Sequence, residues 1–140
     1  MLTIKQSQFE HVEVFVQDVF KEQAETYFDE LRDKEEERLT LAAYEGEHLA
    51  GAVVAKRQYD HIYIEFITVD SAFQGRKIGS KLMNAIENLS KERNIINITL
   101  RTRSYQAAGF YKKCGYTCYA TLDDMPMRGV SMHYFVKRLN

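Results

Sequence analysis

Several features that would mark a specialised class of protein are scarce in this sequence. It has one proline, Pro126, no tryptophan, and two cysteines, Cys114 and Cys118. Two cysteines with no histidine cluster beside them cannot form a disulfide framework, and they lack the further ligands that a zinc site requires. We therefore expect two free thiols and no bound metal.

An excess of charge of one sign is also missing. The 19 Lys and Arg residues balance 20 Asp and Glu residues, so no overall field would attract nucleic acid or an acidic membrane. No apolar run approaches the roughly 20 residues that span a bilayer, and the amino end lacks the basic-then-apolar order of a signal peptide. These absences favour a cytoplasmic protein that binds neither nucleic acid nor membrane.

The residues that are present suffice for one hydrophobic core. Hydrophobic residues make up 45% of the 140 residues and aromatic residues 12%, and a chain of this length is typical of one domain. The sequence contains no internal repeat and no low-complexity tract. We expect a single domain over residues 1–140.

Hydrophobic spacing in the first half predicts helices followed by antiparallel strands. Apolar residues recur at helical spacing over 9–20 and again over 24–31, which predicts two amino-terminal helices. A short strand near 2–5 is an option. Alternating patterns separated by short polar turns then predict an antiparallel meander of three strands. These strands cover 39–44, 49–56 and 62–69.

The second half alternates helices with strands. A helix over 78–89 connects strand 62–69 to a strand over 95–102, and such a crossover implies a parallel, right-handed pairing. Ser104 is placed to cap a further helix that ends at Gly115. Two last strands are expected over 117–122 and 132–139. The class is therefore mixed α/β, with a mostly antiparallel central sheet flanked by helices.

The segment 74–80, QGRKIGS, is the strongest functional signal. It holds two glycines and two cations between a strand and a helix. Free backbone N–H groups and the positive end of the helix dipole favour a phosphate at such a position. An ordinary helix start explains the cations poorly, because they oppose the dipole. The segment therefore predicts a phosphorylated cofactor.

This segment and the later segment 104–116 resemble two signatures of the GNAT superfamily of acyl-CoA-dependent N-acetyltransferases. Gln74 and Gly79 match the ends of the cofactor signature, with Lys77 where a glycine is usual. The second signature is matched by Ala107, Phe110, Tyr111, Gly115 and Tyr116, with Ser104 in place of an asparagine. The resemblance implies a GNAT-like fold with a splayed parallel strand pair, and acetyl-CoA as cosubstrate.

The resemblance also implies which residues bind acetyl-CoA. Loop amides would hold the pyrophosphate, and the backbone of the splayed strand would hold the pantetheine arm. The implied residues are Ile67, Thr68, Val69, Gln74, Gly75, Arg76, Lys77, Ile78, Gly79, Ser80, Ser104, Ala107 and Tyr111. The Lys77 side chain would point outward and contact phosphate together with Arg76. For Ser104, a helix cap alone is an alternative to a pantetheine contact.

Two residues are implied as catalytic. Tyr111 resembles the family's general acid, which protonates the departing thiolate, and the alternative is an ordinary core aromatic. Glu65 resembles a general base that takes a proton from the incoming amine. We expect it on the strand face that carries Tyr63, Ile67 and Val69, because regular strands alternate. The alternative is a structural glutamate paired with Arg57, Arg101 or a lysine.

The expected reaction is transfer of an acetyl group to a primary amine of a small molecule or peptide. Cys114 as an acyl carrier is disfavoured, because no adjacent histidine would form its thiolate. Acidic residues over 22–37 would attract polyamines or aminoglycoside-like antibiotics if they form a wall of the acceptor cleft, although a solvated face is the plainer interpretation. Segment 123–129 would form the opposite rim, with His133 and Tyr134 as further options.

Other functions stay open at this stage. A non-catalytic acyl-CoA sensor with the same fold is one alternative, for which Lys77 and Ser104 are the arguments. A nucleotide-phosphate binder is another, although the loop lacks the Gly-Lys-Ser/Thr ending of a P-loop. Members of the resembled family often pair through their last strands, so a homodimer is a further expectation.

Overall fold

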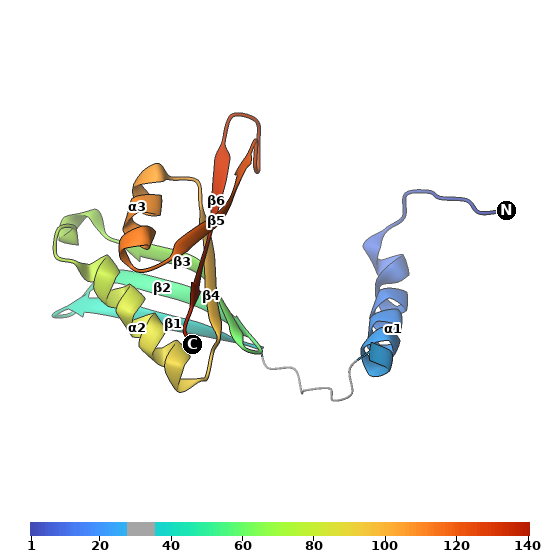
Figure 1. The fold of residues 1–140 in the computed structure, drawn as a ribbon, viewed down its shortest axis with the longest axis horizontal. Coiled ribbons are helices and arrows are strands. Elements are labelled where there is room, and N and C mark those ends of the chain that lie inside the picture. Colours follow the sequence, from blue (N-terminus) through green and yellow to red (C-terminus); the bar gives the residue numbers. More distant parts are fainter. Residues whose placement is uncertain (28–35) are drawn as a thin grey trace. The chain divides into compact units, whose positions relative to one another are not determined.

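The computed structural model describes residues 1–27 and 36–140, and the chain divides into two compact units, residues 1–33 and 34–140. In the first unit, α1 (Phe9–Tyr27) is a single helix (Figure 1). The prediction of two helices is wrong for the described residues, because Ala24 and Tyr27 continue α1 through a polar interval of good helix formers. Residues 28–31 of the predicted second helix lie outside the described residues.

Residues 2–5 form no strand, which corrects that option. A strand needs a partner for its backbone groups, and no ladder is recorded for these residues. None of the helices in the described ranges is long and apolar enough to cross a membrane.

The second unit contains a six-stranded sheet in the order β1-β2-β3-β4-β6-β5. Its strands are β1 (Glu36–Glu45), β2 (His48–Gln58), β3 (His61–Val69), β4 (Asn97–Thr102), β5 (Thr117–Asp123) and β6 (Ser131–Arg138). The helical segments are η1 (Ser71–Phe73), α2 (Ile78–Glu92) and α3 (Tyr105–Lys113). Only β3 and β4 pair in parallel, and the other neighbours are antiparallel. The predicted mixed sheet with one parallel pair is confirmed.

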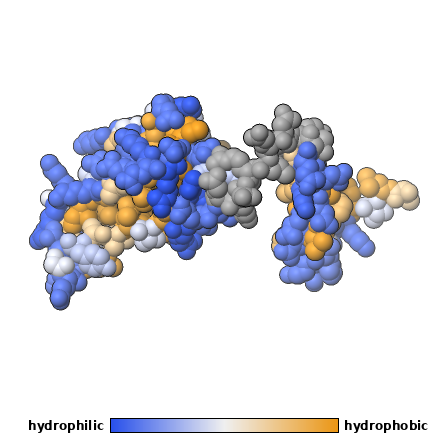
Figure 2. Space-filling view, turned by 90° about the horizontal axis from the view of Figure 1, so that it is seen from below, coloured by the Kyte–Doolittle hydropathy of each residue, from blue (hydrophilic) through white to orange (hydrophobic). Residues whose placement is uncertain are grey.

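Helices α2 and α3 build one core with the sheet (Figure 1). The amphipathic pattern of α2 buries Leu82, Met83 and Ile86 against strand residues such as Ile62 and Phe135. Each such side chain removed from water contributes roughly 1.5–3 kcal/mol. Hydrophilic residues cover most of the visible surface of this unit, with a hydrophobic area among them (Figure 2). The core therefore fixes the inner face of β3, where the functional segments meet.

A β-bulge interrupts β3 at Glu65. Ala55 of β2 pairs with Ile64, and the next recorded pair joins Val54 to Phe66, so Glu65 is an extra residue in the ladder. After an extra residue, each side chain points to the face opposite to the one that regular alternation would give it. Ile67 therefore lies on the core face with Ile64, opposite Val53, which is fully buried.

The bulge corrects one prediction. Regular alternation places Glu65 on the same face as Ile67 and Val69, but the structure places Glu65 with Tyr63 on the opposite face. The error arose because alternation holds only in an uninterrupted strand.

Strands β3 and β4 separate soon after they begin. Their parallel ladder consists of His61 with Asn97, Ile62 with Ile98, and Tyr63 with Thr99. Beyond these pairs, β3 continues along β2 to Val69, whereas β4 continues along β6. The backbone of β3 after Tyr63 therefore has an edge that β4 does not pair, which is the splay expected from the sequence.

Candidate active site

A cavity of about 580 Å³ lies where β3 and β4 diverge. It is lined by the end of β3, the segment between β3 and α2, and one face of α3. Of the predicted cofactor residues, those lining it are Ile67, Val69, Gln74, Gly75, Lys77, Ile78, Gly79, Ser80, Ala107 and Tyr111. The tertiary fold therefore brings two segments that are distant in the sequence to one cavity.

The loop before α2 presents its backbone to this cavity. Gly75 and Lys77 both adopt left-handed conformations, with φ values of 83° and 59°, and Lys77 caps α2 without a side-chain hydrogen bond. The first N–H groups of a helix have no partner within it, and a left-handed residue beside them turns successive amides toward one point. The residues present therefore fit a diphosphate, with the Lys77 ammonium group as an added positive charge.

Gly79 lies beside two hydrophobic residues of the cavity lining. A Cβ atom built at this position would lie 3.4 Å from Cζ of Phe110 and 3.9 Å from Cγ2 of Val69. Both neighbours line the cavity. These are ordinary van der Waals distances, so a Cβ at this position would contact both neighbours without displacing them.

Three predicted cofactor residues do not line the cavity. Arg76 pairs with Glu45 at 3.8 Å and lies over the ring of Phe73 at 5.2 Å. Thr68 is exposed, and the Ser104 hydroxyl accepts a hydrogen bond from the Ala107 N–H at 3.2 Å. The helix cap predicted for Ser104 is confirmed. Contacts of these three residues with the cosubstrate stay predictions.

Three lining residues were not among the predicted site residues: Phe73, Gln106 and Phe110. The sequence could have indicated two of them, because helical spacing places Gln106 and Phe110 on the same helix face as the predicted Ala107 and Tyr111. Phe73 belongs to the short η1 turn, and no periodicity in the sequence indicates where its ring points.

Tyr111 joins the core to the cavity. It is 8% exposed, and its ring lies 5.3 Å from that of Phe110 and 5.8 Å from that of Phe135. Burial, with a smaller contribution from Cys114, raises the pKa of the Tyr111 hydroxyl. A buried phenol of this kind keeps its proton at neutral pH, so it can act as a donor. The two interpretations of Tyr111, core aromatic and acid, are therefore compatible.

Glu65 lines a different cavity on the opposite face of the sheet. Its carboxylate lies 3.5 Å from Arg38 Nη2 and 3.7 Å from Lys56 Nζ. The Arg38 contact is at the limit for a hydrogen bond, and Oε1 is buried without a hydrogen-bond partner. The alternative interpretation named Arg57, Arg101 or a lysine as partner. The structure provides the lysine, Lys56, whereas Arg57 contacts Glu37 at 3.2 Å. Glu65 is therefore flanked by two cations, although Oε1 has no hydrogen-bond partner among the described residues.

This second cavity has a volume of about 540 Å³. Its walls come from β3, β4, the start of β6 and the loop between β5 and β6. The lining residues are Tyr63, Glu65, Phe66, Arg101, Thr102, Arg103, Met125, Pro126 and Met132. Met125 and Pro126 belong to the predicted rim segment. His133 does not line this cavity, because it is buried beside Tyr105 and interacts through Nδ1 with Thr121 Oγ1 at 3.0 Å.

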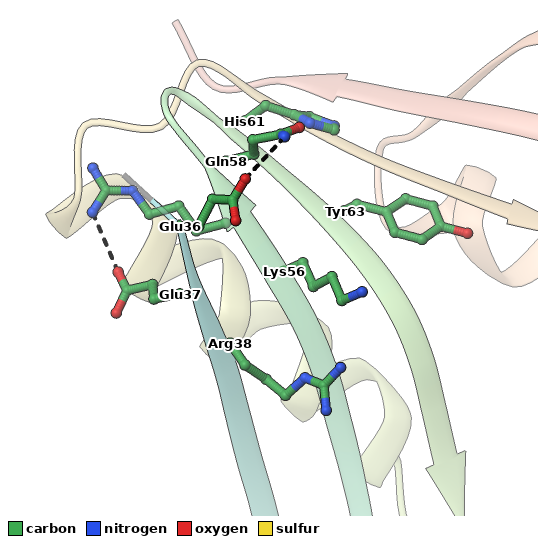
Figure 3. A pocket seen from close by; sticks show the side chains of 8 residues that line it. Glu36, Glu37, Arg38, Lys56, Gln58, His61 and Tyr63 are labelled. Carbon is green, nitrogen blue, oxygen red and sulfur yellow. Dashed lines mark hydrogen bonds and ion pairs between the residues drawn. The ribbon is translucent and has the colours of Figure 1, made fainter. Parts of the chain in front are cut away.

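A third cavity, of about 640 Å³, lies along the first three strands (Figure 3). Several polar groups in its walls already have partners: Glu37 contacts Arg57 and Arg93, and Gln58 donates to Glu36 at 3.3 Å. Neither functional segment reaches it. The cavity with the loop at 74–80 and the cavity with Glu65 are therefore the candidate active site.

Comparison with known proteins decides the family. Residues 4–116 match the model of the acetyltransferase (GNAT) family. The chain belongs to this family. The GNAT fold and the enzyme class expected from the sequence, an acetyltransferase, are thereby confirmed.

Individual relatives agree with this assignment. The chain is 33% identical to blasticidin-S acetyltransferase of Streptomyces morookaense over 101 residues, which are 71% of this chain and 74% of that protein. An acetyltransferase from Bacillus cereus has a TM-score of 0.80 and 31% identity, over 99% of this chain and 98% of the other. An aminoglycoside 6′-N-acetyltransferase complexed with coenzyme A shares the fold, with a TM-score of 0.68 and 20% identity over 92% and 86% of the two chains.

Proposed function

We propose that this GNAT enzyme transfers the acetyl group of acetyl-CoA to a primary amine of a small molecule, by direct attack in a ternary complex. The observation that carries the proposal is the pair of cavities on opposite faces of the sheet at the splay of β3 and β4. One cavity holds the amide-rich loop and Tyr111, and the other holds Glu65. A thioester and an amine could thus approach each other from opposite sides.

The loop side would bind the cosubstrate. Amides around Gly75, Ile78 and Gly79 would donate to the diphosphate, and the unpaired edge of β3 at Ile67 and Val69 would hydrogen-bond the pantetheine amides, as an added strand does. Acetyl-CoA supplies an activated acyl group with a thiolate leaving group. The backbone N–H near Ile67 would donate to the oxygen that gains charge during attack.

Glu65 and Tyr111 would move the protons. Glu65 Oε1, directly or through a water, would take a proton from the incoming ammonium group, because only the free amine is a nucleophile. Tyr111 would give its proton to the departing sulfur. Burial raises the pKa of the Cys114 thiol, so this residue is poorly suited to carry the acyl group.

Relatives support a small-molecule acceptor. One carries blasticidin S in its name and another an aminoglycoside. We extend from these names only the class of acceptor, a small molecule with an amine. Residues 1–140 as one domain, and a homodimer paired through the last strands, stay predictions that sedimentation of the intact chain tests.

The test is a panel of amines incubated with acetyl-CoA and followed by thiol release. We expect release that depends on at least one amine and is lost in Tyr111→Phe, with coenzyme A binding retained by calorimetry. Coenzyme A binding without release from any amine would instead indicate the non-catalytic acyl-CoA-binding alternative. Stabilisation by ATP but not by acetyl-CoA would contradict both.

A further inference from the structure

The charges around the second cavity are not balanced. Among the residues that the structure describes, Glu65 is the one acidic residue in its lining, and Arg101 and Arg103 are the basic ones. The Glu65 carboxylate is already flanked by Arg38 and Lys56. Among the described residues, no carboxylate forms an ion pair with Arg101 or Arg103. An amine that enters this cavity therefore meets more positive than negative charge.

Arg101 is held in place by neutral groups. It lies on β4 opposite Tyr134 of β6, and its guanidinium interacts with the side chains of Tyr63 and Tyr134. Phenol groups orient a guanidinium without cancelling its charge. Tyr63, Tyr134 and Arg101 also line a shallow hollow that continues from the cavity. The positive charge is thus positioned at the cavity wall and remains available to a ligand.

The positive charge extends over the neighbouring strands. Arg38, Lys56 and Tyr63 stand opposite one another across β1, β2 and β3, so they project from the same face (Figure 3). A wholly cationic acceptor would be repelled by this surface. A carboxylate on the acceptor would remove the conflict, because guanidinium groups bind carboxylates through paired hydrogen bonds.

We propose that the acceptor carries a carboxylate close to its amine, as an amino acid does, and that Arg101 binds that carboxylate while Glu65 faces the amine. This inference rests on the proposed function. It differs from the polyamine-like acceptor expected from the acidic segment 22–37. Residues 28–35 of that segment lie outside the described residues, and Glu36 and Glu37 line a different cavity, where Glu37 is held by Arg57 and Arg93.

Matched pairs of amines isolate the carboxylate. The pairs are tyrosine with tyramine, histidine with histamine, arginine with agmatine, and lysine with cadaverine. Members of a pair differ in the carboxylate and in amine basicity. For each amine, kcat/KM of the wild type is therefore divided by kcat/KM of Arg101→Gln. This ratio is then compared between the two members of a pair, because the difference in basicity cancels in it. Saturating acetyl-CoA is used throughout, and thiol release gives the rates.

We expect the wild type to prefer the carboxylate member of the pairs that it acetylates. Arg101→Gln should lower kcat/KM for that member by about tenfold or more and change the decarboxylated member by less than about twofold, as expected for the loss of a charge-assisted hydrogen bond. Arg101→Lys should restore part of the loss. Arg138→Gln, at the end of β6, is the matched control and should change neither member.

Three results would overturn the inference. Preferred acetylation of the decarboxylated members, or of spermidine, would contradict it while leaving the proposed function intact. An equal loss for both members in Arg101→Gln, with unchanged melting temperature and coenzyme A binding, would reduce Arg101 to a general structural role. Thiol release from no amine at all would overturn the proposed function, and this inference with it.

Discussion

Ile64 and Ile67 lie on the same face of β3 although three positions separate them, because Glu65 is an extra residue in the ladder with β2. This β-bulge at Glu65 has two consequences for the candidate active site. It keeps the end of β3 apolar on the side of the loop cavity, and it leaves Glu65 facing the second cavity. A regular strand would place the glutamate and the cosubstrate-facing residues on one side.

Tyr111→Phe is expected to lower kcat by about 10²-fold, as loss of a general acid does, and to leave the Kd of coenzyme A nearly unchanged. The aromatic packing is kept while the hydroxyl is lost. Thiol-release kinetics and calorimetry measure the two quantities. Tyr44→Phe, at an exposed position of β1, is the control. An unaltered kcat in Tyr111→Phe would remove this residue from the acid's role.

The pH dependence supplies a second check on Tyr111. Because burial raises the pKa of its hydroxyl above the ordinary value of 10.0, the protonated form persists at and above that pH. The rate is therefore expected not to fall through ionisation of Tyr111 below pH 10. A decline that begins at lower pH and disappears in Tyr111→Phe would contradict the assignment.

Glu65→Gln is expected to reduce activity most at neutral pH and less at high pH, where the amine is already deprotonated. The melting temperature should change little, because ion pairs with exposed partners contribute little to stability. The side chains of Arg38 and Lys56 are 62% and 57% exposed. The measurement is kcat/KM across pH, with Glu92→Gln as control. A constant ratio between variant and wild type would indicate a structural glutamate.

Gly75 and Gly109 form a matched pair for stability. A Cβ at either position would meet no atom within 4 Å, but Gly75 has a φ of 83° whereas Gly109 lies within α3. Gly75→Ala is expected to lower the free energy of unfolding by about 1 kcal/mol, and Gly109→Ala to raise it by about 1 kcal/mol. Urea denaturation measures both.

The two glycines should also differ in ligand binding. Gly75→Ala alters the loop backbone, so it should weaken coenzyme A binding in calorimetry, whereas Gly109→Ala should not. Equal affinities for the two variants would show that the left-handed conformation at Gly75 does not shape the phosphate site.

His61 is expected to make stability depend on pH. Burial lowers the pKa of His61 from its ordinary value of 6.5, and the ring contacts Thr99 Oγ1 at 2.6 Å. The unfolded chain then binds a proton more readily than the folded chain. The stabilisation is therefore fully present above pH 6.5 and is lost as pH falls through 6.5 toward the folded-state pKa.

The variant His61→Gln should remove this part of the pH dependence. Melting temperatures measured between pH 5 and 8 test it, with His11→Gln in α1 as the control. The same slope in His61→Gln and wild type would show that another group is responsible.

Much of the fold follows from local pattern. The helical face of α2, the alternation in the strands, and the capping of α3 by Ser104 are each properties of a few neighbouring residues, so the sequence indicates them directly. The loop at 74–80 and Tyr111 could be located for the same reason, since a signature is a short arrangement in sequence. In the second unit the ends of elements shifted by a few residues, whereas in the first unit a single helix stands where two helices were predicted.

Other features of the sheet depend on which strands pair with each other, and the sequence of a single strand does not specify its partner. The insertion of β6 between β4 and β5, the separation of β4 from β3, and the bulge at Glu65 are set by which ladders form. Phe73 lines the cavity for the same reason: its position depends on packing against other elements. Local periodicity could not indicate it, because its neighbours in space come from other elements.

By itself, the sequence determined most elements of residues 36–140 and indicated the acetyltransferase family, because these depend on local spacing and short motifs. Phosphate binding by the loop at 74–80 stays a prediction. Only the tertiary structure decided which face of β3 carries Glu65 and which charges surround the second cavity. The physical reason is that one extra residue in a ladder reverses the direction of every side chain after it, and electrostatic surroundings are sums over residues that only folding brings together.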